Sequence, residues 1–572
     1  MTDPAAIGGV VAVAAATIAV GSRGLRVSRT PADFLVAARQ VPPGLNAAAI
    51  SGEYLSAASF LGVAGLALAD GVGALWYAVG YAAGYLVLLA VVAAPLRRFG
   101  AYTIPDFAEG RLDSPLLRRV ATVLVVLICA FYLLPQMEGA GETLQAVGGG
   151  PYWVGVVTLG VLVTGAIASG GMKGITFVQS FLYWLKLLAI AVPALSLALI
   201  FHHPPVAHLD GRAPATFAQA TTVEFPHAED VQVSSAVEVR VAGGLDGAAV
   251  DGYLVLAPGP HRIAASTRIV FPAGSPAPAV AGPQTLSAAQ WASPLLRLGG
   301  RSDHPLAATY GVILATFLGA LGLPHILVRF YTNPDGQAAR RTTALVILLL
   351  SVFYVWPAVF AVLGRLEAPS LYLTGRTDTV VLVLPRLVGA GVGERILTAL
   401  TAGGAFAAFL STSSGLLIAM SGAVSHDILG RGVVAFRWAA IGTGTATTLA
   451  GLAVAGTSIN VLVGWAFAIA ASSFCPLLVL GIWWPGLTWR GALAGLIIGG
   501  GASSAAVVTS LAGVGERGWW AVLLQVPALW TVPLAFATMI VGSRLSKGSL
   551  PHDVMRKMLV LHLPEEVRRR AG

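Results

Sequence analysis

Residues 405–427 read AFAAFLSTSSGLLIAMSGAVSHD, an apolar run interrupted only by small and hydroxyl-bearing residues. Four consecutive hydroxyls, on Ser411, Thr412, Ser413 and Ser414, fall where a membrane-spanning helix would be deepest. A helix that faces lipid gains nothing from them, because each hydroxyl can only bond to its own backbone and the small side chains bury little apolar surface. The run therefore indicates either close packing between helices or the coordination of an ion.

The composition of the whole chain agrees with a helix in lipid. Of the 572 residues, 56% are hydrophobic and 11% are charged, which is too little polar surface to cover a soluble globule. Apolar runs of about 20 residues recur along the chain, each long enough to cross a hydrocarbon core about 30 Å thick. They predict an all-α integral membrane protein with about 13 transmembrane helices. The expected spans lie near 6–22, 44–68, 74–96, 116–147, 151–170, 175–201, 306–329, 343–364, 396–425, 434–454, 459–483, 490–511 and 518–543.

Basic residues set the expected orientation. The net charge of +9 would suit a nucleic-acid partner, but the Lys and Arg residues fall mainly in short connections after odd-numbered spans, which is the positive-inside pattern. We therefore expect a lipid bilayer, the plasma (inner) membrane, and no nucleic acid as partner, with the N-terminus outside and the C-terminus in the cytoplasm. The first apolar run lacks a basic segment before it, so it reads as an uncleaved helix. Cys129 and Cys475 lie within apolar runs and indicate neither disulfides nor a metal site.

The connection at 202–305 is far longer than a usual loop, and long segments are translocated largely regardless of charge, so we expect it outside. The segments VQVSSAVEVRV (231–241), DGYLVL (251–256) and STRIVF (266–271) alternate or cluster β-branched residues between turns. They predict a small strand-rich insert, and a disordered loop rich in Pro and Ala is the alternative. The segment at 552–570 mixes apolar and basic residues and predicts a partly interfacial helix.

Two sets of five spans flank this loop. Because each set contains an odd number of helices, the second set is inserted in the opposite orientation, and an inverted repeat is geometrically available. The first helix of each set carries features that weaken it, namely small residues with Glu53 in span 44–68, and Pro324 in span 306–329. Proline removes a donor and frees a carbonyl beside it. Interrupted helices at matching positions predict a transport site at the midplane.

Five segments carry a family pattern and occur in the expected order. They are DFLVAARQVPPGLNAAAISGEYLSAASFLG (33–62), GAYTIPDFAEGRL (100–112), GGMKGITFVQSFLYWLK (170–186), LGLPHILVRFYTNPDG (321–336) and FLSTSSGLLIAMSGAVSHDIL (409–429). They resemble the sodium:solute symporter family, and most of all its cation/acetate (monocarboxylate) symporters. The resemblance implies a LeuT-like fold of five plus five helices in an inverted repeat, with one helix before and two after, and alternating access coupled to sodium. The expected division is 1–43 first helix and linker, 44–201 first repeat, 202–305 loop insert, 306–483 second repeat, 484–543 two peripheral helices and 544–572 tail.

The same resemblance implies a sodium site between the spans at 44–68 and 396–425. Adjacent hydroxyls project about 100° apart around a helix, so both reach one ion only where another segment crosses. A contact between small residues is the alternative, and two further hydroxyls, on Ser413 and Ser414, are assigned to packing. The expected ligands are three carbonyls and two hydroxyls, on Ala47, Ile50, Ala408, Ser411 and Thr412.

Polar residues elsewhere in the spans are expected on the path of the ion. Gln179 stands where many relatives carry an acidic residue near the inward sodium exit, which questions a charged release path. Lys186 lies about 18 Å from the cytoplasmic end at helical rise, too deep for easy snorkelling. It either attracts a carboxylate substrate or pairs with a buried acid such as Glu138, which we favour. Arg329 is expected near the inner face, as an anchor or gate partner.

A small monocarboxylate suits a helix break, where free amides bind the anion and an apolar pocket accepts the methyl group. Glu53 is expected just after the break, where it couples protons, holds the unwound segment or makes a structural hydrogen bond. His325 either donates to the carboxylate or satisfies freed carbonyls. The expected substrate-binding residues are Glu53, Tyr54, Gln136, Leu323, Pro324 and His325.

Together these patterns predict a symporter that couples inward sodium movement to the uptake of acetate or a similar small organic anion, with proton coupling as an alternative. A sodium symporter for proline or a sugar is the second interpretation, and a channel or a transporter-derived sensor is the third. We expect no enzyme, because no Ser/His/Asp, HExxH or Cys-rich constellation lies on one membrane face. The sequence does not indicate an oligomeric state.

Overall fold

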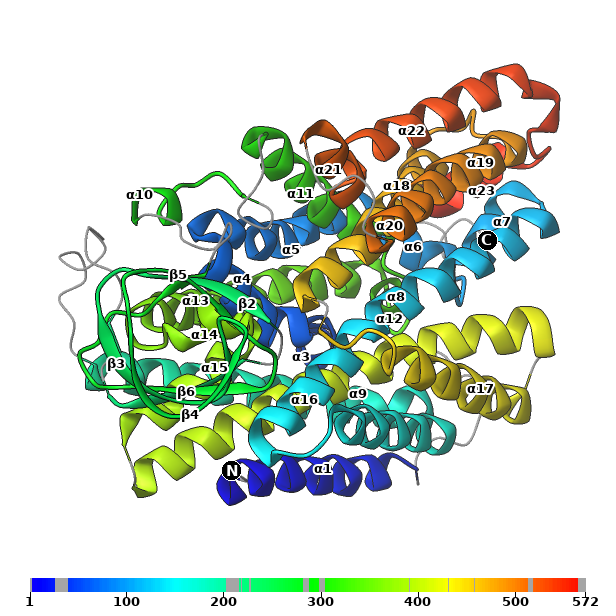
Figure 1. Ribbon diagram of the computed structural model, residues 1–572. Helices are drawn as coiled ribbons and strands as arrows, with labels where there is room; N and C mark the ends of the chain where they lie inside the picture. Colours follow the sequence, from blue (N-terminus) through cyan, green and yellow to red (C-terminus); the bar gives the residue numbers. More distant parts are fainter. Residues whose placement is uncertain are drawn as a thin grey trace.

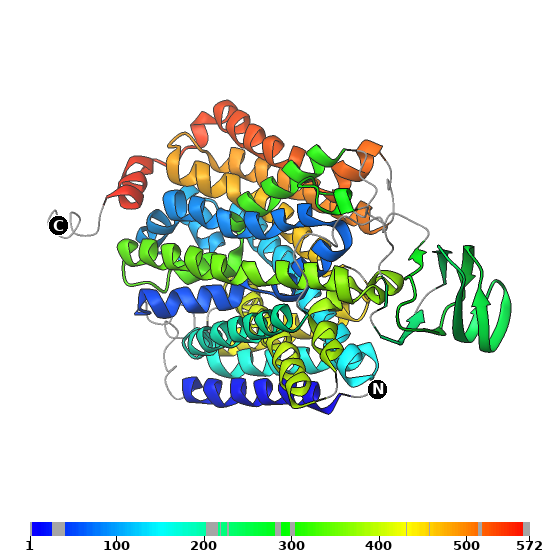
Figure 2. The same cartoon turned by 90° about the vertical axis from the view of Figure 1, so that its left-hand side faces the viewer.

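The computed structural model describes residues 3–25, 40–201, 216–217, 219–225, 228–280, 288–297, 304–389, 391–430, 432–456, 458–512 and 518–563. Helices make up most of it, and a small β-sheet lies beside the helical bundle (Figure 1). Figure 2 shows long helices running side by side, with the N-terminus and the sheet at one end and the C-terminus at the other. The N-terminus and the long loop therefore share one end of the bundle, and their orientation in the membrane stays a prediction.

The first half of the bundle follows the expected spans closely. Its elements are α1 (Pro4–Leu25), α3 (Pro43–Tyr54), η2 (Ala58–Gly62), α4 (Val63–Asp70), η3 (Val72–Leu75), α5 (Trp76–Val87), η4 (Leu88–Val92), α6 (Ala93–Phe99), α7 (Ile104–Leu112), α8 (Pro115–Gly148) and α9 (Tyr152–Ile200). The spans expected at 151–170 and 175–201 both lie within α9, as apolar pieces at Tyr152–Ala168 and Gly174–Ile200.

The second half begins after the insert. Its elements are α11 (Pro305–Gly319), η6 (Ala320–Gly322), α12 (Pro324–Phe330), α13 (Gly336–Glu367), α14 (Ser370–Thr374), η7 (Thr377–Thr379), α15 (Val380–Val383), η8 (Leu384–Val388), α16 (Val392–Val424), η9 (Ser425–Leu429), α17 (Val433–Gly451), α18 (Ile459–Trp483), α19 (Trp489–Gly495), η10 (Leu496–Gly500), α20 (Gly501–Leu511), α21 (Gly518–Gln525), α22 (Ala528–Leu545), η11 (Lys547–Ser549) and α23 (Val554–His562). The span expected at 518–543 is divided between α21 and α22.

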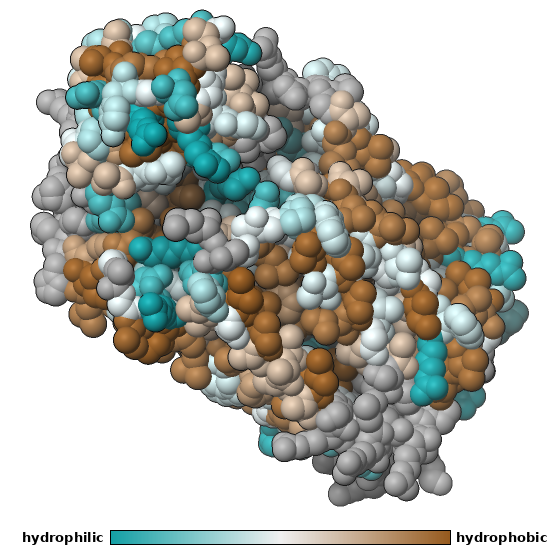
Figure 3. Space-filling view, turned by 60° about the horizontal axis from the view of Figure 1, so that its bottom comes forward, coloured by the Kyte–Doolittle hydropathy of each residue, from teal (hydrophilic) through white to brown (hydrophobic). Residues whose placement is uncertain are grey.

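The helices are long and apolar enough for a membrane. Within the described ranges nine of them qualify, or ten when the bent pair Pro43–Tyr54 and Ala58–Asp70 is taken as one span. Two shorter apolar helices, Pro4–Val20 and Tyr152–Ala168, add to these. Figure 3 shows apolar side chains covering much of the helical part of one face, while hydrophilic ones gather toward its ends. The chain is therefore a multi-pass membrane protein, and the total of about 13 helices remains a prediction.

The long loop holds the expected strands, together with the short helix α10 (Ala288–Trp291). Its sheet is antiparallel, in the order β1-β6-β3-β5-β2-β7, with β4 paired to β3. Alternate residues of β3 point into a separate apolar core, which Leu373 of α14 completes. The strands are β1 (Thr221–Phe225), β2 (Glu229–Val233), β3 (Val237–Leu245), β4 (Ala248–Leu256), β5 (Gly259–Ile263), β6 (Thr267–Phe271) and β7 (Ala279–Val280).

The insert is tied to the bundle at the end of α4. The indole N–H of Trp291 donates a hydrogen bond to the carbonyl of Leu68 at 3.1 Å, and the hydroxyl of Tyr372 donates to the same carbonyl at 2.8 Å. The guanidinium of Arg365 lies 5.0 Å from the centre of the Trp291 ring. Helix α10 of the insert is therefore joined to the bundle by directional contacts, and the sheet packs on the bundle through Leu373 of α14.

Helix α16 lies at the centre of the bundle and packs against α1, α8 and α9. In its most apolar stretch 94% of the residues are buried, so its small residues serve helix contacts rather than lipid. Gly415 shows how close the approach is, because a Cβ there would overlap the carboxylate of Glu53 on α3. The hydroxyl-bearing run at 405–427 is thus held against the weakened helix of the first half.

Candidate functional site

The two weakened helices are both interrupted, as predicted. In the first half α3 ends at Tyr54 and Leu55 adopts φ −73° and ψ 89°, after which the chain turns by 71° into the second segment. In the second half Leu323 is extended, with φ −74° and ψ 114°, between a 3-10 turn and α12. Each interruption leaves backbone groups without helical partners inside the bundle. Glu53 precedes the break rather than following it, because α3 continues for one residue beyond it.

The hydroxyls of α16 meet the carbonyls freed at the first break. The Ser411 Oγ lies 2.8 Å from the carbonyl oxygen of Gly52, and the Thr412 Oγ1 donates a hydrogen bond to the carbonyl of Glu53 at 2.6 Å. The Ala408 carbonyl is 3.1 Å from the Ser411 Oγ. All of these groups belong to buried residues. The structure therefore gathers three of the five expected sodium ligands, on α16, at the break in α3.

The other two expected ligands lie elsewhere on α3. Ala47 and Ile50 are inside its regular turns, where a carbonyl pairs with the amide four residues ahead. The carbonyls that face the hydroxyls belong to Gly52 and Glu53 instead. The break therefore falls a few residues later in the chain than the sequence pattern indicates, and the roles of Ala47 and Ile50 remain a prediction.

Lys186 of α9 also reaches this place. Lys186 is fully buried, and its ammonium donates hydrogen bonds to the carbonyl of Leu55 at 2.7 Å and to the Ser411 Oγ at 2.8 Å. A third hydrogen bond goes to the carbonyl of Gly52. The expected pairing with Glu138 is wrong, because that carboxylate accepts from the Tyr152 hydroxyl at 2.5 Å and from the backbone at 2.7 Å.

Arg329 lies in the protein core. It is 1% exposed, and its Nε is 2.7 Å from a carboxylate oxygen of Glu53, which is also 1% exposed. It donates to the Thr176 hydroxyl at 2.8 Å and to the side-chain oxygen of Gln179. The Gln179 amide in turn donates to the carbonyl of Ser411 at 3.2 Å. One network of hydrogen bonds therefore joins the two interrupted helices to α9 and α16.

Two of the expected substrate residues hold the helices in place. The Tyr54 hydroxyl donates to the carbonyl of Tyr81 at 3.0 Å, and the Gln136 side chain accepts from the amide of Ala57, just past the break, at 2.9 Å. Gln136 thus satisfies one of the amides at the break, a group that was expected to bind the substrate anion. Both side chains stabilise the shape of the break.

His325 differs from the other expected residues in having unused hydrogen-bonding groups. It is 1% exposed and follows Pro324 in the second interrupted helix, yet neither ring nitrogen has a hydrogen-bond partner among the residues that the structure describes. Its ring lies 5.2 Å from that of Tyr132, which lies 5.7 Å from Phe467. The Phe467 ring in turn lies 6.1 Å from that of Tyr54. A buried polar edge therefore faces an aromatic wall between the two breaks, which is the composition of a site for a small amphipathic solute.

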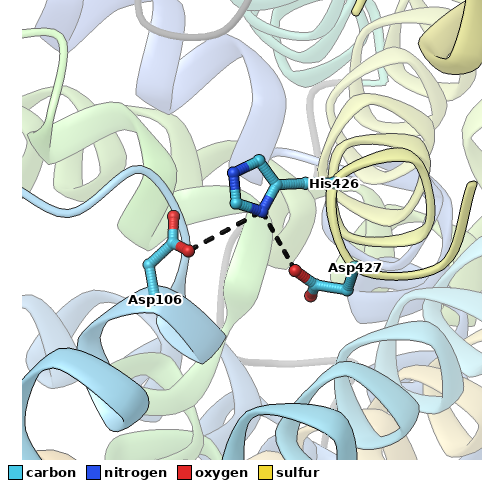
Figure 4. Close-up of side chains that lie close together, drawn as sticks. All are labelled: Asp106, His426 and Asp427. Carbon is cyan, nitrogen blue, oxygen red and sulfur yellow. Dashed lines mark hydrogen bonds and ion pairs between the residues drawn. The ribbon is translucent and has the colours of Figure 1, made fainter. Parts of the chain in front are cut away.

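A second charged cluster lies at the end of α16 and was not predicted. Asp106, His426 and Asp427 point toward one another (Figure 4), with His426 Nδ1 3.0 Å from Asp427 and 3.8 Å from Asp106. These three are arranged as metal ligands can be. However, the Arg118 guanidinium lies 2.8 Å from Asp106, 2.6 Å from Glu109 and 2.6 Å from Asp427. Because that cation already occupies the carboxylates, the cluster is an ion-pair network joining α7, α8 and η9.

Some of these residues carried a sequence signal and others did not. Arg329 and Glu53 are both ionisable residues in apolar runs, and such residues usually pair with one another. The carbonyls of Gly52 and Leu55 carried none, because a backbone group takes part through chain geometry rather than through residue type.

Comparison with known proteins gives concordant matches. The family model described as the sodium:solute symporter family matches residues 34–199 and 303–499. An uncharacterized symporter, YwcA, of Bacillus subtilis is 27% identical over 97% of this chain and 98% of its own. A monocarboxylic acid transporter of Corynebacterium glutamicum is 27% identical over 94% of this chain and 91% of its own. A solved structure of a Na⁺-coupled sialic acid symporter, in a substrate-bound outward-open state, covers 95% of this chain and 97% of its own with a TM-score of 0.62 and 14% identity. The last match concerns the fold alone.

Proposed function

Because the chain belongs to the sodium:solute symporter family and has a LeuT-like fold, we propose that it is a secondary active symporter that couples sodium entry to the uptake of acetate or a similar short monocarboxylate. The observation that carries the proposal is the meeting of the α3 break with the hydroxyls of Ser411 and Thr412. Uncharged oxygens on two separate elements suit an ion that must be both bound and released. The segments 44–201 and 306–483 form the two inverted repeats of this proposal.

We place sodium between α3 and α16. Its ligands would be the hydroxyls of Ser411 and Thr412 and the carbonyl of Ala408, with carbonyls of α3 completing the set. Ala47 and Ile50 would serve if α3 unwinds further toward its start. In the structure the two hydroxyls and the break carbonyls satisfy one another, so sodium binding would exchange these hydrogen bonds for ion contacts.

We place the substrate between the two breaks. The unpartnered ring of His325 would donate to a carboxylate, and the aromatic rings of Tyr132 and Phe467 would face its short apolar part. Charge supports an anion here, because Arg329 and Lys186 bring two positive charges against the single carboxylate of Glu53. The relative from Corynebacterium glutamicum, a monocarboxylic acid transporter, supports the same substrate class.

We also propose the plasma membrane as location, with the N-terminus and the 202–305 insert outside and the C-terminus in the cytoplasm. The sheet and the N-terminus lie at one end of the bundle and the C-terminal helix at the other, which supports this topology (Figure 2). The lysines and arginines of the short connections support the cytoplasmic assignment.

Uptake into proteoliposomes tests the proposal. The purified full chain is reconstituted, and uptake of labelled acetate, propionate, pyruvate, proline and glucose is measured with an inward sodium gradient and with choline in place of sodium. We expect saturable uptake of the short carboxylates that sodium stimulates. Uptake of proline or glucose in preference to them would overturn the substrate class, and sodium-independent uptake would overturn the coupling.

Variants locate the ion. Removing both hydroxyls with Ser411→Ala and Thr412→Ala should raise the half-saturating sodium concentration by about tenfold per hydroxyl, taking about 1.4 kcal/mol for each lost contact. The matched control is Ser473→Ala, which removes a buried hydroxyl that, in the described part of the chain, donates within its own helix to the carbonyl of Ile469. That control should leave the sodium dependence unchanged.

A further inference from the structure

Lys186 has the contacts of a bound metal cation rather than those of an ion-pair partner. Its ammonium is fully buried and is held by the carbonyls of Gly52 and Leu55 and by the Ser411 Oγ. An ammonium has three N–H donors, and these three oxygens use all of them. None of the three carries a formal charge.

The nearby acid is already engaged. Glu53 lies 2.7 Å from the guanidinium of Arg329. In the part of the chain that the structure describes, no carboxylate makes an ion pair with Lys186. Uncharged oxygens that surround a cation at a helix break are the ligand type that a transported sodium ion would use. The side chain of Lys186, on α9, therefore places a positive charge where α3 and α16 meet.

We propose that Lys186 is a tethered stand-in for the coupling ion: its ammonium occupies the sodium position in the sodium-free protein and must leave before sodium binds. The inference rests on the proposed sodium coupling and names the residue that controls it. The Ser411 Oγ is the shared ligand, because it contacts Lys186 in the structure and would contact sodium in the loaded state.

The two cations exclude each other for an electrostatic reason. Two unit charges about 4 Å apart, in a surrounding of effective dielectric constant about 20, repel enough to weaken the binding of the second by about a thousandfold. The long lysine side chain can relieve this by turning away from the break. A resident charge of this kind also keeps the freed carbonyls satisfied while the empty carrier returns.

The charge balance of the site also favours one cation at a time. With Arg329 paired to Glu53, the site has one excess positive charge when either Lys186 or sodium is present, and a monocarboxylate would neutralise it. Both cations together would leave a second charge uncompensated in the core. One cation for one anion is therefore the arrangement that the site favours.

Sodium binding to the purified full chain in detergent tests the inference. Thermal unfolding is followed by tryptophan fluorescence across a sodium chloride series, with choline chloride holding the ionic strength constant. A ligand that binds the folded state raises the unfolding temperature as its concentration passes the dissociation constant. We expect Lys186→Met to reach half of its sodium response at a concentration at least tenfold lower than the wild type, because the competing charge has gone.

Two further variants assign the effect to the site. Adding Ser411→Ala to Lys186→Met should raise the sodium concentration of half-response again by about tenfold, since the shared ligand is lost. Lys547→Met, which removes an exposed lysine from the turn after α22, should respond as the wild type does. Equal sodium responses in wild type and Lys186→Met, within a factor of two, would overturn the inference, as would a half-response concentration of Lys186→Met that Ser411→Ala leaves unchanged.

The inference remains testable if Lys186→Met is unstable. Purification in sodium should then rescue its yield relative to choline, and Lys186→Gln, with direct binding of ²²Na⁺ to the protein, supplies the second measurement under the same criteria. The outcome is separable from that of the transport assay. If wild-type uptake is independent of sodium while Lys186→Met gains sodium binding, the stand-in role is supported and the proposed sodium coupling fails.

Discussion

The ion pair between Arg329 and Glu53 makes the sharpest prediction about the core. Both side chains are 1% exposed, and their charged atoms lie 2.7 Å apart. Arg329→Met removes the cation and leaves the carboxylate buried without its partner, while the hydroxyl of Thr176 and the oxygen of Gln179 lose a donor. Breaking a buried pair from one side costs about 3–5 kcal/mol, so we expect the free energy of unfolding to fall by that amount.

The assay is a double-mutant cycle in mixed micelles, in which unfolding by sodium dodecyl sulfate is followed through tryptophan fluorescence. Glu53→Gln should destabilise the protein about as much as Arg329→Met does, because it leaves the guanidinium unpaired. The double variant should be more stable than the sum of the two losses predicts by at least about 2 kcal/mol, since no unpaired charge remains. Arg340→Met, on the exposed side of α13, is the control and should change stability by less than about 0.5 kcal/mol.

Additive losses would refute the reasoning. If the double variant equals the sum of the single variants within about 0.5 kcal/mol, the two groups do not interact in the folded protein. Single losses below about 1 kcal/mol would refute the burial of the pair, because solvent-exposed ion pairs contribute only that much.

Three further predictions concern other parts of the chain. Gly415→Ala should cost about 1–3 kcal/mol and reduce uptake, because its Cβ would overlap the neighbouring carboxylate, whereas Gly422→Ala on the same helix, where a Cβ meets nothing within 4 Å, should be neutral or slightly stabilising in the same unfolding assay. Arg118→Met should lower the thermal unfolding temperature in low salt, because three carboxylates lose their shared cation. In the insert, the hydrogen bond between Asp246 and His261 raises the pKa of the imidazole above its ordinary 6.5 and lowers the pKa of the carboxyl below its ordinary 3.8. The pair therefore stabilises the sheet fully between about pH 4 and 6.5 and loses that effect as pH rises through the imidazole pKa, so Asp246→Asn should speed hydrogen exchange of the insert most within that window.

The sequence predicted the membrane architecture well, because its signals are local. Apolar runs placed most helices to within a few residues, although α13 begins earlier than expected, at Gly336, and α9 joins two expected spans. Weakened segments located the interruptions near Glu53 and Pro324. Alternating β-branched residues predicted the strands of the insert. Each of these signals depends on a period or a residue type that a single segment displays.

The site itself was predicted less completely, because its geometry depends on where the backbone turns. The family pattern placed the α3 carbonyls at Ala47 and Ile50, but the helix remains regular through both and ends at Tyr54. Lys186 was expected beside Glu138, yet the depth of a residue along one helix does not reveal which neighbouring helix it faces. Tertiary packing decides such pairings, and a single sequence does not record it.

The joint between the insert and α4 has a practical consequence. Trp291 of the insert bonds to the carbonyl of Leu68, near the far end of the bent segment that begins at the α3 break, and Tyr372 of α14 bonds to the same carbonyl. The insert is thus a folded unit beside the helical bundle, and it is fixed to α4, the helix that follows the bend. An antibody fragment raised against the sheet would add a rigid mass for single-particle microscopy and, by holding that joint, would select one conformation of the transporter without touching the membrane.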